Sequence, residues 1–208
     1  MIGLKVRTPS HYFTPVPAAE PTGRERTVRF EDGGRVYRFR TAPGVFSRGG
    51  VDRGTRLLLE AVDPAAARTI LDLGCGYGPL GIVLAGRAPG ARVTLVDVNP
   101  RAAALAAINI RDNALPNAEA RAGDGCAPVG DEPFDLILLN PPIRAGRAVV
   151  VRLLGEAHAH LAPGGRFYLV ARTSQGARTL ARCMAEVFGR VREVERGGGF
   201  RVYEGRDV

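Results

Sequence analysis

The chain has 208 residues, of which 45% are hydrophobic and 24% charged, and this composition is typical of one globular domain with a full core. No apolar run approaches the roughly 18 residues of a membrane span, and residues 1–10 lack the apolar segment of a secretory signal. The sequence therefore predicts neither membrane insertion nor secretion, and we expect a cytoplasmic protein.

Cysteine content and net charge give further information on the class of protein and its partner. The cysteines Cys75, Cys126 and Cys183 lie far apart without metal-ligand spacing, which predicts no disulfide framework and no metal site and is typical of a reducing compartment. The formal net charge of +8 favours a polyanionic partner such as RNA. An arginine-rich and alanine-rich composition is also typical of GC-rich or thermophilic genomes, so the charge alone does not decide the partner.

The first fifth of the chain differs in pattern from the rest. Residues 11–21 are rich in proline and alanine, which predicts an extended arm. Polar and apolar residues then alternate on both sides of a glycine turn, which predicts a β-hairpin with strands at residues 27–30 and 35–39. We assign residues 1–45 to an N-terminal arm and hairpin extension and residues 46–208 to the main domain.

From residue 69 onward, predicted strands and helices alternate along the chain. The predicted strands are residues 69–73, 91–96, 118–122, 134–139, 166–171, 191–194 and 200–203. The predicted helices are residues 51–62, 79–86, 100–112, 147–161 and 175–188. The apolar strand at 134–139 is long enough to be buried on both faces of a sheet. The alternation predicts an α/β fold with a mostly parallel, doubly wound Rossmann-like sheet covered by helices on both faces.

A glycine-rich turn follows the strand at residues 69–73, with glycines at its first, third and fifth positions: Gly74, Gly76 and Gly78. Glycine lets the backbone turn sharply and approach a ligand closely. A dinucleotide-binding fingerprint instead needs glycines at the first, third and sixth positions around a pyrophosphate. Asp72, just before the turn, disfavours a pyrophosphate and favours a cationic ligand. S-adenosylmethionine, which carries a sulfonium and an α-ammonium group, meets this requirement.

Two further acids lie at the ends of predicted strands. Asp97 follows the strand at 91–96, where an acid can accept both hydroxyls of a ribose. Asp124 follows the strand at 118–122, where its side chain can meet an adenine amino group. Taken singly, Asp97 is also explained as a helix cap and Asp124 as a turn residue. Their order along the chain, behind a glycine turn, favours a cofactor site.

The strand at 134–139 is followed by Asn140, Pro141 and Pro142, which we predict to be the catalytic residues. Ligands of open parallel sheets bind at the carboxyl ends of strands, so Asn140 should face the site. An amino group on a base or an amide is a weak nucleophile because its lone pair is delocalised. The Asn140 side-chain oxygen and the Pro141 carbonyl can accept its two N–H bonds and direct the lone pair toward a methyl group.

The prolines fit this role because they bring no competing N–H donor and hold the backbone stiff. In isolation, the same three residues are explained as an ordinary turn that ends a strand. Their place behind a cofactor turn favours catalysis.

Together these motifs resemble those of "small domain" class I methyltransferases, which use S-adenosylmethionine. Residues 44–55 are similar to the segment that precedes the glycine turn in small-subunit ribosomal RNA guanine-N2 methyltransferases. The similarity continues through residues 144–146 and 175–177 and covers most of the chain from about His11 onward.

The resemblance implies a seven-stranded sheet whose last strand runs antiparallel. The implied cofactor contacts are Asp72, Gly74, Cys75, Gly76, Tyr77, Gly78, Asp97, Val98, Asn99, Asp124, Gly125 and Asn140. The implied substrate contacts are Phe46, Ser47, Ile143 and Arg144, with the segment around Phe46 and Ser47 folded over the cofactor or the substrate.

The chain departs from the family pattern in two places. Larger bacterial members carry an additional N-terminal methyltransferase-like domain, in place of which this sequence shows only the arm and hairpin. Related enzymes often have an aromatic residue at the position of Ile143, and isoleucine packs on a base but stacks less well. The guanidinium plane of Arg144 either compensates for this or is a solvated surface charge.

Three functions remain open from the sequence. The first is methylation of guanine N2 in ribosomal RNA or a ribosomal subunit, and the second is methylation of a glutamine side-chain amide in a protein such as a release factor. The third is a catalytically silent module that binds RNA. The net charge and Ile143, where glutamine enzymes usually have tyrosine, favour RNA, and the presence of Asp72, Asp97 and Asn140 favours an active enzyme. The pattern is compatible with a monomer or a homodimer.

Overall fold

The computed structural model describes residues 25–47, 49–142 and 145–207. The strands in these residues are β1 (Arg26–Asp32), β2 (Arg35–Thr41), β3 (Thr69–Leu73), β4 (Arg92–Asp97), β5 (Ala118–Ala122), β6 (Phe134–Leu139), β7 (Leu161–Arg172), β8 (Arg190–Gly197) and β9 (Phe200–Arg206). The helices are α1 (Arg53–Ala61), α2 (Pro79–Arg87), α3 (Pro100–Asp112), α4 (Arg147–Ala159) and α5 (Ala177–Phe188), with 3-10 turns η1 (Ala127–Val129) and η3 (Thr173–Gln175). The predicted arm at residues 11–21 lies outside the described residues.

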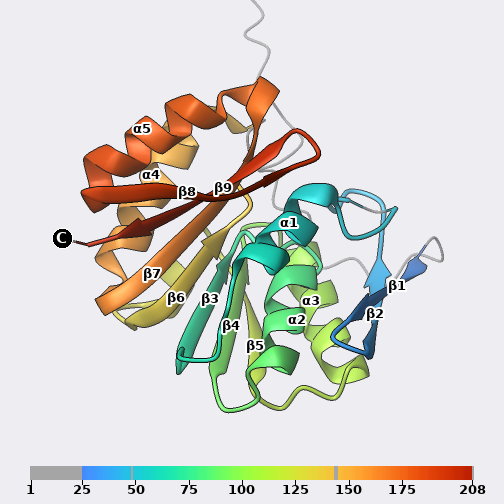
Figure 1. The fold of residues 1–208 in the computed structure, drawn as a ribbon. Coiled ribbons are helices and arrows are strands. Elements are labelled where there is room, and N and C mark those ends of the chain that lie inside the picture. The colour runs from blue at the N-terminus through green and yellow to red at the C-terminus, as the bar shows by residue number, and fades with distance from the viewer. Residues whose placement is uncertain (1–24, 48, 143–144, 208) are drawn as a thin grey trace, which may run out of the picture.

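In the described part of the chain, seven strands form one sheet in the order β5-β4-β3-β6-β7-β9-β8 (Figure 1). The pairs from β5 to β7 are parallel, whereas β9 lies antiparallel between β7 and β8. The chain moves outward from β3 to β5 and then returns to the other side of β3 with β6. Open α/β sheets bind ligands at such a reversal, outside the carboxyl ends of the strands. The predicted doubly wound sheet with an antiparallel last strand is confirmed.

Helices cover both faces of this sheet, with α1, α2 and α3 on one face and α4 and α5 on the other (Figure 1). The side chains of β6 show why both faces of the sheet are covered. Leu136 and Leu138 belong to one core, Ile137 and Leu139 belong to the other, and all four are fully buried. A strand that is apolar throughout is typical of burial on both faces. No helix within the described ranges is long and apolar enough to cross a membrane.

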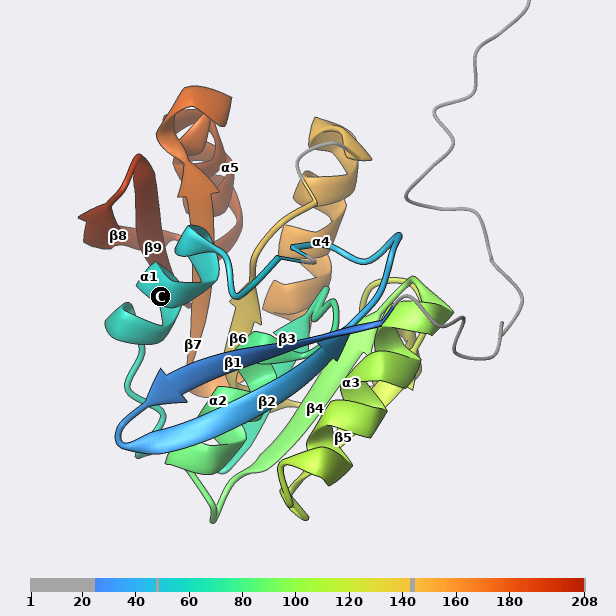
Figure 2. The same cartoon turned by 90° about the vertical axis from the view of Figure 1, so that its right-hand side faces the viewer.

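The predicted hairpin is present and lies across α2 and α3 (Figure 2). Its apolar face joins the core of the sheet, because Tyr37 and Phe39 of β2 are fully buried there. A Cβ atom on Gly86 of α2 would lie only 2.1 Å from the Tyr37 hydroxyl. The hairpin therefore packs on α2 as closely as the absence of a side chain at residue 86 permits.

Two asparagines bind the backbone of β2: Asn109 on α3 and Asn113, the residue that caps the end of α3. Asn109 accepts a hydrogen bond from the Arg40 amide at 2.7 Å and donates to the Arg40 carbonyl at 3.0 Å. Asn113 makes the same pair of bonds with Arg38, at 3.0 and 2.7 Å. Asn109 also donates to the Tyr77 carbonyl in the glycine turn, at 2.8 Å. The two amides thus satisfy backbone N–H and C=O groups on the outer edge of β2. Asn109 also attaches this edge to the glycine turn.

The largest correction to the predicted bounds lies between α4 and β7. The sequence predicts that the helix beginning at residue 147 extends to residue 161 and that a Pro-Gly-Gly turn separates it from a strand starting at residue 166. Instead, α4 ends at Ala159 and β7 begins at Leu161, which pairs with Phe134 of β6. The next pair is Leu136 with Arg166, so the proline and glycines form an irregularity inside the strand. Proline and glycine can occupy a bulge without ending a strand.

The bonds of Asn109 predict a stability effect. Replacement of this fully buried residue, Asn109→Ala, leaves the Arg40 amide and the Tyr77 carbonyl without their partner. We expect the free energy of unfolding to fall by about 2–3 kcal/mol, as measured by urea denaturation. The matched control on the same helix is Arg111→Ala at an exposed position, which should change it by less than about 0.5 kcal/mol. Equal stability of the two variants would contradict the structural role of Asn109.

Candidate active site

The glycine turn between β3 and α2 forms one wall of the site. Gly74, Gly76 and Gly78 have φ angles of +76°, +59° and +92°, in the left-handed region that favours glycine. A Cβ atom on Gly78 would also lie 2.9 Å from Ile82 and 3.0 Å from Leu95. Backbone conformation therefore favours glycine at all three positions, and close packing requires it at Gly78.

Asp72, the predicted acid before the turn, is buried beneath it. The residue is 2% exposed, and its Oδ2 atom accepts a hydrogen bond from the Gly81 amide at 2.8 Å. Burial raises the pKa of Asp72 to about 7; the Gly81 hydrogen bond opposes this rise, and the charge of Asp97 adds to it. A cation placed beside such a carboxyl group favours its ionised form, so the position suits a positively charged ligand.

Asp97 ends β4 and holds the turn from the other side. Its carboxylate accepts hydrogen bonds from the Gly76 amide at 2.7 Å and the Asn99 amide at 2.8 Å. Burial raises the pKa of Asp97, and these two hydrogen bonds oppose the rise. The cap of α3 is Asn99, which accepts from the Arg101 amide at 3.0 Å. Asp97 therefore does not serve as the helix cap that the sequence left open for it.

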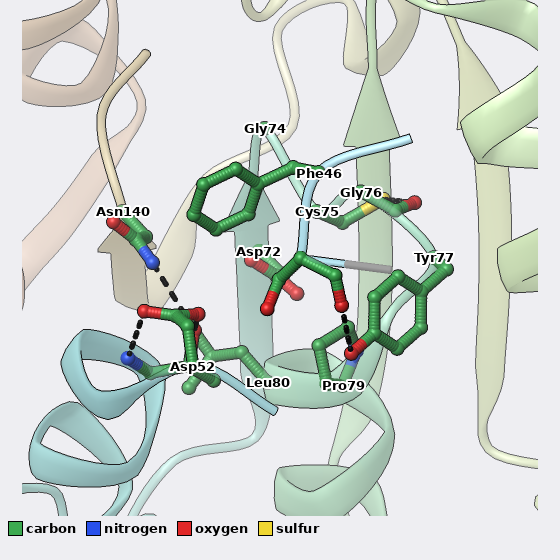
Figure 3. A pocket seen from close by; sticks show the side chains of 12 residues that line it. Phe46, Asp52, Asp72, Gly74, Cys75, Gly76, Tyr77, Pro79, Leu80 and Asn140 are labelled. Atoms are coloured by element: carbon green, nitrogen blue, oxygen red, sulfur yellow. Dashed lines mark hydrogen bonds between the residues drawn. The ribbon is translucent and has the colours of Figure 1, made fainter. Parts of the chain in front are cut away.

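Asn140 follows β6 and lies across a cavity from the glycine turn (Figure 3). Its Nδ2 atom donates to Thr55 Oγ1 at 3.1 Å. The cavity is lined by Phe46, Ser47, Asp52, Thr55, Asp72, Gly74, Cys75, Gly76, Tyr77, Pro79, Leu80 and Asn140. This lining contains two carboxyl groups and no basic side chain, which is the charge pattern that a cationic cofactor needs.

Phe46 and Ser47, which follow the hairpin, form another wall of the cavity. Phe46 is 52% exposed and lies between Asn140 and the glycine turn (Figure 3). Ser47 has a positive φ of 55°, and its carbonyl accepts a hydrogen bond from the Tyr77 hydroxyl at 3.5 Å. The Tyr77 ring is buried, and burial raises the pKa of its hydroxyl. The predicted pair Phe46 and Ser47 is thus held against the turn.

Several predicted residues lie outside this lining: Gly78, Asp97, Val98, Asn99, Asp124, Gly125, Pro141 and Pro142. Asp124 is exposed, and its carboxylate forms an ion pair with Arg152 at 2.7 Å. The ion pair uses Oδ1, and the contact of Asp124 with adenine stays a prediction. The predicted substrate contacts Ile143 and Arg144 lie outside the described residues.

Two polar residues of the lining, Asp52 and Thr55, are not predicted from the sequence. Asp52 caps α1 by accepting from the amides of Gly54 and Thr55, at 2.9 and 3.2 Å. An acid just before a helix is a recognisable start signal. Nothing in the sequence shows that this helix begins beside Asn140, 85 residues further along the chain than Thr55.

A family model of the methyltransferase small domain matches residues 36–204. The chain belongs to this family. The predicted resemblance is confirmed, and the domain is a methyltransferase of the class that uses S-adenosylmethionine.

Similar proteins include an uncharacterised Bacillus subtilis protein, YbxB, which is 32% identical over 95% of this chain and 98% of its own length. The ribosomal RNA small subunit methyltransferase C of Pseudomonas fluorescens is 40% identical over 79% of this chain and 49% of its own. Among solved structures, the T. thermophilus 16S rRNA N2 G1207 methyltransferase in complex with AdoMet and guanosine is similar, with a TM-score of 0.80 and 31% identity over 92% of this chain and 53% of its own. The methyltransferase domain thus spans about half the length of these ribosomal RNA methyltransferases.

The raised pKa of Asp72 predicts how cofactor affinity changes with pH. With a pKa of about 7, the ionised fraction rises from about a tenth at pH 6 to about nine tenths at pH 8, so a cationic ligand should bind roughly tenfold tighter at pH 8. Calorimetric Kd values for S-adenosylmethionine at the two pH values measure this change. The variant Asp72→Asn keeps the shape but cannot ionise, so it reports any pH dependence of the ligand itself. Equal pH dependence in both proteins would contradict the prediction.

Proposed function

We propose that this domain transfers a methyl group from S-adenosylmethionine to the exocyclic N2 atom of a guanine in ribosomal RNA. The observation that carries the proposal is the position of Asn140, at the carboxyl end of β6 and across an acid-lined cavity from the glycine turn. An amide oxygen at this place is an acceptor for a planar amino group. The similarity to a guanine-N2 methyltransferase solved with AdoMet and guanosine supports the same substrate.

In this proposal, each acidic residue binds a different part of the cofactor. S-adenosylmethionine, when bound, supplies an electrophilic methyl group. Asp72 lines the cavity and favours the positive charge of the ligand, and Asp97 accepts the ribose hydroxyls at the end of β4. The adenine contact of Asp124 and the contacts of Val98, Asn99 and Gly125 stay predictions.

The chain's own residues then prepare the nitrogen. The Asn140 Oδ1 atom and the Pro141 carbonyl accept the two N–H bonds of the amino group and direct its lone pair toward the methyl carbon. Among the described residues, none donates a hydrogen bond to Asn140 Oδ1, so this oxygen is available to the substrate. With the cofactor bound, the nitrogen would take the methyl group as the C–S bond of the sulfonium breaks, and the methylated nitrogen would release its proton to water. Positioning therefore replaces a dedicated base.

The exposed ring of Phe46 at the mouth of the cavity suits a base. An aromatic side chain stacks on any base because every base has a π face. This ring supplies the aromatic surface that Ile143 does not, and we propose that it packs on the target guanine or on the cofactor adenine.

Two arginines near Asn140 suit the phosphates of RNA. Arg172 ends β7, and its guanidinium lies 4.8 Å from the centre of the Phe200 ring. Phe200 in turn packs on Gly54, where a Cβ atom would lie 3.0 Å from the ring. Gly54 stands between the exposed Arg53 and Thr55, the partner of Asn140. Arg53 and Arg172 have no carboxylate partner among the described ion pairs, so they can bind phosphate.

The two other candidate functions fit these observations less well. A glutamine amide presents the same nitrogen chemistry to Asn140, but a protein substrate gives no role to the guanidinium groups of Arg53 and Arg172, which have no carboxylate partner among the described residues. A silent module gives no role to the amide oxygen of Asn140, which accepts no hydrogen bond from the described residues. The cytoplasmic location, the choice between monomer and homodimer, and the division at residue 45 stay predictions.

Methyl transfer from labelled S-adenosylmethionine tests the proposal directly. Unmodified ribosomal RNA, ribosomal subunits and release factor are offered in parallel, and we expect label in RNA that digests to N2-methylguanosine. The variant Asn140→Ala should lower the rate about a hundredfold because it removes one transition-state contact. Label only in protein would establish the glutamine activity instead, and a near wild-type rate for Asn140→Ala would refute the mechanism.

The RNA surface has a separate test. The double variant Arg53→Ala with Arg172→Ala should weaken RNA binding and reduce the slope of log K against log salt by about 1 for each phosphate that the protein no longer neutralises. Fluorescence anisotropy over a salt series measures both quantities. The double variant Arg111→Ala with Arg190→Ala removes the same charge at exposed positions away from Asn140 and is the control. Equal effects of the two double variants would show a general charge effect and no specific surface.

A further inference from the structure

A chain of hydrogen bonds connects the catalytic asparagine to a carboxylate on another element. Asn140 Nδ2 donates to Thr55 Oγ1 at 3.1 Å, and Thr55 Oγ1 donates to Asp52 Oδ2 at 2.5 Å. Thr55 is 3% exposed, so water does not replace these partners. The chain joins the end of β6 to the first turn of α1 (Figure 3).

The Asp52 carboxylate sets the direction of both hydrogen bonds in this series. A carboxylate is an acceptor only, and a hydroxyl has a single proton. Because the Thr55 proton is committed to Asp52, only the lone pairs of Oγ1 remain for Asn140. The asparagine must therefore present its NH₂ group to Thr55, and its Oδ1 atom must point away from Thr55. The orientation of an asparagine amide is otherwise decided by small differences between two similar faces.

We propose that Thr55 and Asp52 are positioning residues that fix the Asn140 amide with its oxygen toward the substrate amino group. The inference rests on the proposed function, because the orientation matters only if Oδ1 accepts from the substrate. A reversed amide would place an NH₂ donor against another NH₂ donor, and Asn140 could no longer accept a hydrogen bond from the substrate.

Asp52 divides its two oxygens between separate tasks. Oδ1 accepts from the amides of Gly54 and Thr55 and caps α1, whereas Oδ2 accepts only the Thr55 hydroxyl among the described residues. A cap needs one oxygen and no negative charge. The ionisable group at this position is therefore explained by the orientation of the amide and is more than the helix start requires.

The variants Thr55→Val and Thr55→Ser test the hydroxyl. Valine keeps the shape and removes the hydrogen bonds, so we expect kcat for methyl transfer to fall about tenfold, with KM and the Kd of S-adenosylmethionine within about twofold of wild type. Serine restores the hydroxyl and should restore kcat to within about threefold. A purely structural role would lower the melting temperature of Thr55→Val and leave kcat of the folded protein unchanged, which would overturn the proposal.

The variant Asp52→Asn tests the direction of the chain. Its amide oxygen keeps the cap of α1, but its new NH₂ group can donate to Thr55, which then donates to Asn140 Oδ1 and reverses the catalytic amide. We expect a loss of kcat at least as large as that of Thr55→Val, with little change in the free energy of unfolding. Wild-type kcat in Asp52→Asn would contradict the proposal.

Two further measurements separate this proposal from the proposed function. In the Asn140→Ala background, Thr55→Val should cause no additional loss of rate, and a full additional loss would show that Thr55 acts elsewhere. In ¹⁵N-labelled wild-type protein, the Asn140 NH₂ protons should show nuclear Overhauser contacts to Thr55 that disappear in Asp52→Asn. This spectrum needs no methyl acceptor, so its absence in wild type refutes the orientation, whereas its presence with no methylated product refutes only the function.

Discussion

The site depends on a buried carboxyl group that serves two structural elements. Asp72 lies one residue before the end of β3 and accepts a hydrogen bond from the amide of Gly81, the third residue of α2. The N-cap of α2 is Gly78, which has no side chain to satisfy the free amides of the first turn, so the strand supplies the cap. Strand and helix must come close for this contact, and a Cβ atom on Gly81 would lie 2.7 Å from Leu95 and 3.0 Å from Asp72. The glycine turn is therefore the short connection that this contact demands.

The burial of the same carboxyl group links cofactor binding to stability. Burial raises the pKa of Asp72 to about 7 from an ordinary value of 3.8, so the folded protein binds more protons than the unfolded chain between these values. The free domain therefore loses stability as pH rises from about 4 to 7. A cationic ligand beside Asp72 reverses this loss because it stabilises the ionised form. The negative charge of the site is thus complementary to the positive charge that the bound cofactor supplies. A pyrophosphate would be repelled by an acid at this position, so the acid favours this cofactor over a dinucleotide.

Local patterns are sufficient to predict most of the fold and the residues nearest the strand ends. The strands at residues 69–73, 118–122 and 134–139 and the helix at 100–112 have the predicted bounds, because each has a clear period or cap. The irregularity inside β7 is not predictable, since proline and glycine end most strands. Thr55 escapes prediction because its role depends on a contact with Asn140, 85 residues away. Sequence patterns report what a residue does for its own element, and they are silent on what it does for a distant one.

The hairpin is a second case in which long-range contacts are not visible in the sequence. Its sequence is typical of an extension that could be separated from the catalytic domain, because it has its own turn and its own period. In the structure, Asn109 joins the Arg40 backbone of the hairpin to the Tyr77 carbonyl of the glycine turn, and Tyr77 donates to the Ser47 carbonyl that follows the hairpin. One buried amide and one buried hydroxyl therefore connect β2, α3, the glycine turn and the segment of Phe46. A change in the hairpin reaches the cofactor cavity through these bonds, so the hairpin belongs to the physical support of the site.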